Sequence, residues 1–224
     1  MKKILLLSVV MQMLCLNVKA QYIETFDSNS LEWTECAYKN AVGTAVIDKG
    51  VMTVKSKGDM KVLGAALSAL AGANGKEAKE EDTALRENTF FETHCYAPID
   101  VQKPFVITSK VNVKLLAEDR LVGLVFNYRD GGNFYCFSFN NSFVKFVRYE
   151  NNEVVGEVMQ GLRTKMKLRT DMVWVLESDG SQLTFKVDDV PSMKIRYMPL
   201  QYSGFGYYTY GNQELVVDEV EFNQ

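Results

Sequence analysis

The sequence has few of the residues that build metal and nucleophilic sites. Among its 224 residues there is one histidine, His94, and the four cysteines form no Cys-x-x-Cys motif. A single histidine cannot build a histidine-rich zinc site, and no serine or cysteine nucleophile motif accompanies it. Glycine-rich phosphate loops and Asp-x-Asp-x-Asp-Gly calcium loops are also missing. We therefore expect no zinc, nucleotide or Ser-His chemistry, and an ordinary strand position for His94.

Proline and excess positive charge are scarce as well. The chain has four prolines, and 25 Lys and Arg against 28 Asp and Glu give a net charge of −3. Hydrophobic residues make up 47% and aromatic residues 12%, which is enough to bury a core. A globular domain is expected, and the negative charge argues against nucleic acid as a partner.

The longest apolar run lies at the start of the chain. Lys2 and Lys3 precede an apolar run from Ile4 to Leu16, and Val18-Lys19-Ala20 follows as a cleavage site. This is the three-part form of a secretory signal peptide, and the run is shorter than the roughly 20 residues that cross a bilayer. We expect residues 1–20 to be removed and residues 21–224 to form one secreted or periplasmic domain without a transmembrane segment, with display at the cell surface left open.

Export changes the interpretation of the cysteines. Cys36, Cys95 and Cys136 would remain, so at most one disulfide can form within a chain. Cys136 lies between aromatic residues and is expected to be a small buried residue. Cys36 and Cys95 are then the candidate disulfide pair, and whether they are bridged stays open.

Strand signals dominate the rest of the chain. Short runs rich in Val, Ile, Thr, Phe and Tyr recur between turns built from Gly, Asn and Asp, which tolerate positive φ. The pattern predicts an all-β fold, an antiparallel β-sandwich. The expected strands are 44–48, 51–55, 90–95, 105–115, 121–128, 134–139, 143–149, 173–177, 183–187, 205–210 and 215–222.

One segment, at about 57–88, departs from the strand pattern. It has no aromatic residue, and Met60, Leu63, Leu67 and Leu70 follow the spacing of one helix face. We expect a short helical or mobile insertion between strands. It would pack on one end of the sandwich, bind a partner or membrane surface, or stay disordered.

A resemblance to a known superfamily begins in the middle of the chain. Gly123-Leu124-Val125-Phe126-Asn127-Tyr128, followed after a Gly-Gly turn by Asn133-Phe134-Tyr135, resembles the central hairpin of concanavalin A-like lectin/glucanase domains, including laminin-G-like ones. Phe26-Asp27 with Trp33, and Val217 to Phe222, are similar to the first and last strands of that jelly roll. The resemblance implies extracellular carbohydrate or protein partners, because members bind glycans, cleave them or serve as structural modules.

Catalytic and metal candidates are few. Glycoside hydrolysis needs two carboxyl groups facing one site. The glucanases of the superfamily carry Glu-x-Asp-x-Glu on one strand, and the nearest approach is Glu219 and Glu221, with Val217 in the first position. The chain resembles the keto-disaccharide hydrolase-like exported domains more distantly, and the motifs expected of those domains are absent. No cofactor is expected, except that Asp27 and Asp218 would form a calcium site if the first and last strands pair.

Aromatic residues supply the candidate binding site. Sugars stack on exposed aromatic faces while nearby polar groups take their hydroxyls. Alternation places Phe205 and Tyr207 on one face and Tyr208 and Tyr210 on the other, and Trp33 and Trp174 in the core. We expect a non-catalytic domain that binds a glycan or cell-surface partner; the alternatives are a glycoside hydrolase-like enzyme and a structural or assembly component. The candidate ligand-binding residues are Tyr128, Arg129, Tyr135, Tyr208 and Tyr210.

Overall fold

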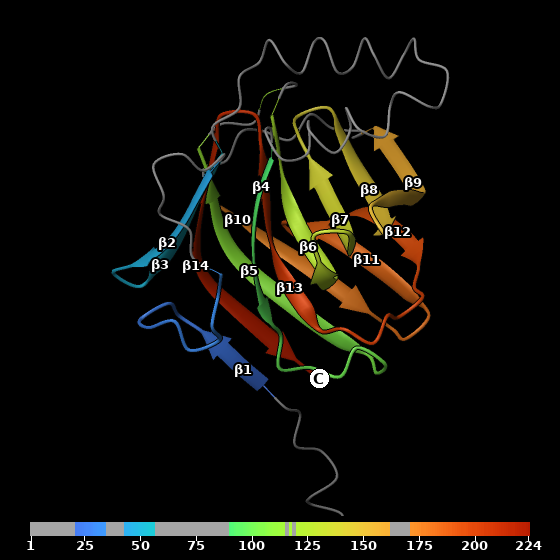
Figure 1. Ribbon diagram of the computed structural model, residues 1–224, viewed down its shortest axis with the longest axis horizontal. Helices are drawn as coiled ribbons and strands as arrows, with labels where there is room; N and C mark the ends of the chain where they lie inside the picture. Colours follow the sequence, from blue (N-terminus) through green and yellow to red (C-terminus); the bar gives the residue numbers. More distant parts are fainter. Residues whose placement is uncertain (1–20, 35–42, 57–89, 115–116, 118–119, 162–170) are drawn as a thin grey trace, which may run out of the picture.

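The structure is a computed structural model, and it describes residues 21–34, 43–56, 90–114, 117, 120–161 and 171–224. Within these residues the chain forms fourteen β-strands and no helix. The strands lie in two layers (Figure 1). The predicted all-β antiparallel sandwich is therefore confirmed. The insertion expected at about 57–88 lies outside the described residues.

Both sheets are antiparallel, and about half of the strands that follow one another in sequence pair with each other. One sheet has eight strands, in the order β12-β11-β10-β5-β14-β3-β2 with β1 also paired to β14. The other has six, in the order β4-β13-β6-β7-β8-β9. The strand bounds are β1 Gln21–Glu24, β2 Gly43–Asp48, β3 Val51–Ser56, β4 Phe90–Tyr96, β5 Phe105–Val113, β6 Leu121–Asp130, β7 Asn133–Phe139, β8 Phe143–Glu150, β9 Glu153–Gly161, β10 Asp171–Ser178, β11 Gln182–Val187, β12 Val190–Arg196, β13 Gly204–Tyr210 and β14 Gln213–Asn223.

Three strands lack a clear signal in the sequence. β1 has only four residues, β12 contains Pro191, and β9 contains glycine and glutamate among its valines. Proline and glycine are depleted in strands, so local propensity favours a turn in such segments. The remaining strands match the predicted segments to within a few residues at each end.

The core fills the space between the two sheets. Strand β5 alternates buried and partly exposed residues along its length, as a strand with one wet face does. Trp33 and Trp174 are both buried as predicted, and the ring of Trp33 stacks on that of Tyr207 at 5.7 Å. The Tyr207 hydroxyl, on β13, donates to the Ser109 Oγ, on β5, at 2.8 Å. This bond joins the two sheets through the core, and burial raises the pKa of Tyr207.

The first and last strands of the described chain are neighbours. Gln21 lies opposite Asn223, and Glu24 lies opposite Val220. The pairing is the condition on which the predicted calcium site depends. β14 itself lies inside the eight-stranded sheet, between β5 and β3.

The described cysteines are buried thiols. Cys95 and Cys136 are both free, so Cys95 is not half of a disulfide in this structure, and Cys36 lies outside the described residues. Burial, together with the nearby Glu24 carboxylate, raises the pKa of the Cys95 thiol. Among the described residues, no helix is long and apolar enough to cross a membrane.

Candidate functional site

A row of stacked rings crosses the outer face of the six-stranded sheet, the face turned away from the eight-stranded sheet. His94 on β4 stacks on Tyr128 on β6, with ring centroids 4.0 Å apart. Tyr128 lies 5.8 Å from Phe134 on β7, and Phe134 stacks on Tyr149 on β8 at 4.8 Å. We call His94, Tyr128, Phe134 and Tyr149 the aromatic row. Four strands thus contribute to one continuous row of ring contacts.

Glycines on β13 make this stack possible. β13 lies between β4 and β6, so a side chain there would separate His94 from Tyr128. Gly206 lies opposite His94, and Gly204 lies opposite both Tyr96 and Tyr128. A Cβ at Gly206 would lie 1.9 Å from the Thr93 carbonyl oxygen, and one at Gly204 2.1 Å from that of Tyr128. Only glycine fits at these positions, and the two rings meet above the bare strand.

The middle of the outer face is apolar and closed. Val125, Tyr128, Phe134 and Cys136 are buried there, and they form a second small hydrophobic cluster separate from the main core. Tyr149 and Tyr208 pack against this cluster and are half-buried. The exposed groups of this face therefore lie toward its ends.

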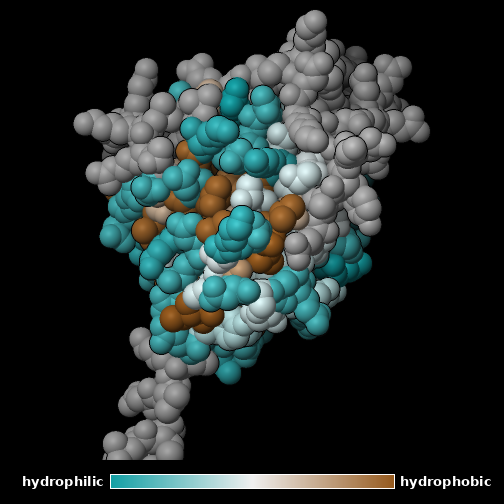
Figure 2. Space-filling view, turned by 90° about the vertical axis from the view of Figure 1, so that its left-hand side faces the viewer, coloured by the Kyte–Doolittle hydropathy of each residue, from teal (hydrophilic) through white to brown (hydrophobic). Residues whose placement is uncertain are grey.

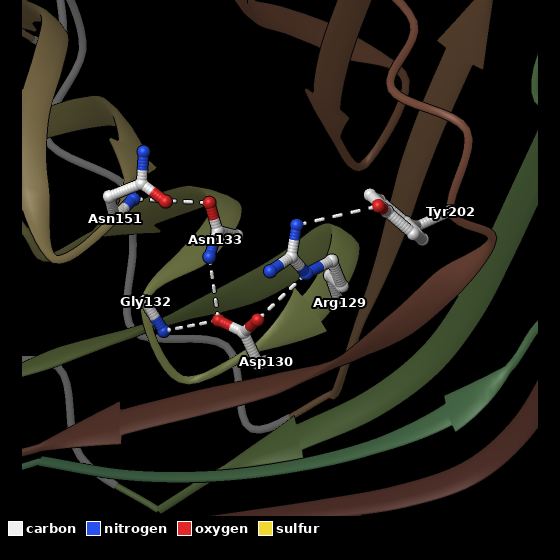
Figure 3. A network of polar contacts seen from close by, with 6 residues as sticks. All are labelled: Arg129, Asp130, Gly132, Asn133, Asn151 and Tyr202. Atoms are coloured by element: carbon white, nitrogen blue, oxygen red, sulfur yellow. Dashed lines mark hydrogen bonds and ion pairs between the residues drawn. The ribbon is translucent and has the colours of Figure 1, made fainter.

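A polar network lies beside the aromatic row, in the β6–β7 turn between Tyr128 and Phe134 (Figure 3). One carboxylate oxygen of Asp130 accepts hydrogen bonds from the Gly132 amide at 2.9 Å and the Asn133 side-chain amide at 2.8 Å. Its other oxygen accepts from the Arg129 Nε at 2.8 Å. The Asn133 bond, then the Gly132 and Arg129 bonds, hold the pKa of Asp130 below its ordinary value. The Asn151 amide donates to Asn133 at 3.1 Å, which ties the β8–β9 turn to the network.

Arg129 and Tyr202 face solvent beside this network. The Arg129 guanidinium lies over the Tyr202 ring, 5.5 Å from its centroid, and its Nη1 donates to the Tyr202 hydroxyl at 3.5 Å. Bonds to Tyr202 and Asp130 raise the pKa of Arg129. Its side chain is still 48% exposed. Tyr96, at the end of β4, is 65% exposed. This end of the sheet combines exposed aromatic faces with fixed polar groups.

No protein-family model matches the chain, and no curated protein matches it in sequence at a significant level. Solved structures do resemble it. A carbohydrate-binding module CBM66 from Bacillus subtilis is 15% identical, with a TM-score of 0.52 over 86% of this chain and 95% of that one. A beta-glucanase from Bacillus licheniformis is 11% identical, with a TM-score of 0.55 over 92% and 98%. A protein with a galectin-like fold, also from Bacillus subtilis, is 11% identical, with a TM-score of 0.54 over 91% and 94%. The chain has the concanavalin A-like jelly-roll fold.

The jelly roll places four of the five predicted ligand-binding residues on or beside one face. Tyr128 belongs to the aromatic row and Arg129 to the polar network. Tyr208 and Tyr210 are half-buried, whereas Phe205 and Tyr207 are fully buried in the core, as the alternation predicted.

Tyr135 was placed wrongly by the sequence argument. It is buried in the core between the sheets, and its hydroxyl donates to the Met198 carbonyl at 2.7 Å. Burial raises its pKa. Tyr135 lies opposite Phe126 and Arg148, so its ring points inward with that of Phe126. It is therefore not available to a ligand on the outer face.

Several residues at this end of the jelly roll could not be identified from the sequence. They come from strands and loops far apart in the chain, and only the sheet order brings them together. Alternation along β4 and β7 would have placed some of them on one face, given the pairing. They are Tyr96, Asp130, Asn133, Phe134, Tyr149 and Tyr202.

The predicted carboxylate pair lies on the other sheet of the jelly roll. Glu219 on β14 forms an ion pair with Lys110 at 2.9 Å. One Glu221 oxygen accepts hydrogen bonds from the side-chain amides of Gln21 at 2.6 Å and Asn223 at 2.8 Å. Both glutamates alternate with the buried Val220. Their contacts are those of a wet strand face, and the aromatic row is on the opposite side of the sandwich.

The predicted calcium site meets its first condition, because β1, which precedes Asp27, pairs with β14, which carries Asp218. Asp27 accepts a hydrogen bond from the Thr25 hydroxyl at 2.8 Å, and Asp218 lies exposed on β14. In the described part of the chain, no group of three or more His, Cys, Asp or Glu side chains could hold a metal ion. Calcium binding by Asp27 and Asp218 stays a prediction.

His94 should give the protein a pH-dependent stability. Burial lowers the pKa of His94 from its ordinary 6.5. The unfolded chain therefore takes up the proton more readily, so this contribution is complete above about pH 6.5 and is lost as the pH falls toward the folded-state pKa. Because His94 is the sole histidine, we expect the urea midpoint to fall between about pH 7 and about pH 5 in the wild type. His94→Phe, which keeps a ring on Tyr128, should flatten that profile; an equal slope in both proteins would contradict the assignment.

Proposed function

We propose that this protein is an exported, non-catalytic jelly-roll module that binds a glycan at the polar network beside the aromatic row. The observation that carries the proposal is the exposed pair of Arg129 and Tyr202, held by Asp130. The C–H face of a sugar ring stacks on an aromatic face, and its hydroxyls bond to fixed polar groups. The carbohydrate-binding module and galectin-like neighbours support this function, and the signal-peptide pattern supports export.

The state of Asp130 supports a binding role over a hydrolytic one. A glycosidase needs a carboxylic acid whose pKa is raised, so that it can protonate the leaving group. The pKa of Asp130 is lowered, and both of its oxygens accept hydrogen bonds from its own chain. Asp130 therefore positions Arg129 and shapes the turn. The hydrolase-like alternative would have to use other carboxylates, and Glu219 is already paired with Lys110.

A glycan array tests the proposal. The array is read once with calcium and once with a chelator. Arg129→Ala and Tyr202→Ala should each weaken binding at least about tenfold, equivalent to about 1.4 kcal/mol. Arg196→Ala is the matched control, because Arg196 is an exposed arginine on β12. Specific binding that the two site variants lose and the control keeps is the expected result. A blank array, or equal affinity in all four proteins, would overturn the proposal, and loss with chelator would add the calcium site.

A further inference from the structure

Strand β9 is an unusual edge of the six-stranded sheet. It is the last strand on its side of that sheet in the described chain, and it runs for nine residues. Apolar side chains are exposed on both of its faces: Val154 by 45%, Val155 by 50%, Val158 by 46% and Met159 by 64%. An edge strand presents unpaired backbone N–H and C=O groups, so β9 offers both hydrogen bonds and apolar surface to a further strand.

The other sheet edges are blunted. β12 carries Pro191 and the cations Lys194 and Arg196. The backbone of β4 is partly covered, because the Thr34 amide donates to the His94 carbonyl at 2.9 Å. β2 has six residues, and the side of the molecule that carries it shows apolar patches interrupted by hydrophilic residues (Figure 2). Short strands, proline and cations are the usual protections of an edge. β9 has no proline, lysine or arginine.

The charges of β9 do not prevent a second copy from approaching. Its ionisable residues are Glu153 and Glu157. Glu157 forms an ion pair with Lys145 on the neighbouring strand at 3.0 Å, so its charge is already balanced. A register that places Glu157 opposite an apolar residue therefore carries no direct repulsion between like charges.

We propose that two copies of this chain pair antiparallel along β9, about a two-fold axis at Val158. This register sets Val158 opposite Val158, Glu157 opposite Met159 and Gly156 opposite Gln160. In this register, residues opposite each other lie on the same face of the sheet. Val158 lies on the core face, because it pairs with the core residue Phe146, whereas Glu157 and Met159 lie on the other face, because they pair with Val147 and Lys145. A register centred on Glu157 would instead put two carboxylates face to face. The self-complementary strand thus makes an isologous interface.

The dimer would also affect glycan binding. Of the statements made about the dimer, only this one rests on the proposed function. The two six-stranded sheets would join into one continuous sheet, and the two-fold axis would be perpendicular to it. Both outer faces, with both polar networks, then face the same way. A surface that carries repeated glycans could engage both sites at once and gain avidity. One strand pair buries less than a standard interface of about 1,600 Å², so we expect a dimer that dissociates below the order of 10 μM.

Sedimentation velocity tests the dimer without any glycan. Between about 1 μM and about 1 mM protein, the wild-type mass should double, which brackets the expected dissociation constant. Val158→Lys should stay monomeric with an unchanged melting temperature. Val190→Lys is the matched control, because Val190 is 63% exposed on β12, and it should dimerise as the wild type does. A wild type that stays monomeric throughout, or a dimer that Val158→Lys leaves intact, would overturn the proposal.

Cross-linking tests the register. In a Cys36→Ser background, where the described cysteines Cys95 and Cys136 are buried, Val158→Cys should give a disulfide-linked dimer under mild oxidation. The Cα atoms of directly opposite residues on antiparallel strands lie about 4.5–5.5 Å apart, within the range that a disulfide spans. Val154→Cys should not cross-link, because in this register Val154 of one copy lies several residues along the strand from Val154 of the other. Equal cross-linking of both variants would refute this register, and a blank glycan array would leave the dimer result standing.

Discussion

Gly206→Ala should prevent β4 from pairing with β13 in the six-stranded sheet. A Cβ at Gly206 would lie 1.9 Å from the Thr93 carbonyl oxygen and 2.8 Å from the His94 Cα, and both contacts are with backbone. Backbone atoms cannot rotate away as a flexible side chain can, so β4 would have to separate from β13. We expect a loss of more than about 4 kcal/mol of unfolding free energy, or a protein that does not fold.

Gly131→Ala is the matched control for this prediction. Gly131 lies in the β6–β7 turn, is exposed, and has no atom within 4 Å of where a Cβ would stand. Its replacement should change stability by less than about 0.5 kcal/mol. Urea unfolding followed by tryptophan fluorescence measures both variants. A Gly206→Ala protein as stable as Gly131→Ala would contradict this close approach of β4 to β13.

Trp174→Ala should be the most damaging core truncation. Trp174 is fully buried on β10, and its ring lies 5.2 Å from Phe139, which belongs to the opposite sheet. Removing a buried tryptophan costs about 3–5 kcal/mol, because the contacts between the two sheets are replaced by a cavity. The expected result is a large drop in the urea midpoint, with a fall in melting temperature that parallels it.

Two further variants identify the source of that loss. Val173→Ala changes an exposed residue on the same strand and should have little effect. Trp174→Phe keeps an aromatic ring but removes the indole N–H, which has no hydrogen-bond partner among the described residues. It should recover at least half of the loss caused by Trp174→Ala, because packing and not a hydrogen bond holds this position. Equal losses for the phenylalanine and alanine variants would contradict that explanation.

The fold could be predicted from local pattern because strand and turn signals are local. Two hairpin turns can be read directly from their residues, because glycine and asparagine-like residues favour tight turns whatever the rest of the fold. They are Asp48-Lys49-Gly50 and the Gly-Gly turn at 131–132. β9 was missed because Gly156 and Glu157 interrupt its valines. Its place is fixed by pairing with β8, a contact that local propensity does not report.

The site was harder to predict, because a bulge changes which residues share a face. Phe126 and Tyr128 are two residues apart, so alternation puts both on one face. In the structure Asn127 has a φ of 50° and the register shifts there, so Phe126 lies in the core and Tyr128 joins the aromatic row. A bulge has no reliable sequence signal. Tyr202 lies in a loop, where strand alternation gives no position, so it could not be placed beside Arg129 from the sequence.

The central position of β14 sets a limit on when this chain can fold. Until residues 213–223 have been synthesised, β5 with β10, β11 and β12 cannot join β3 with β2, because β14 lies between them. β1 must also wait for a strand that begins about 190 residues later. A growing chain therefore cannot complete its larger sheet before residues 213–223 have left the ribosome.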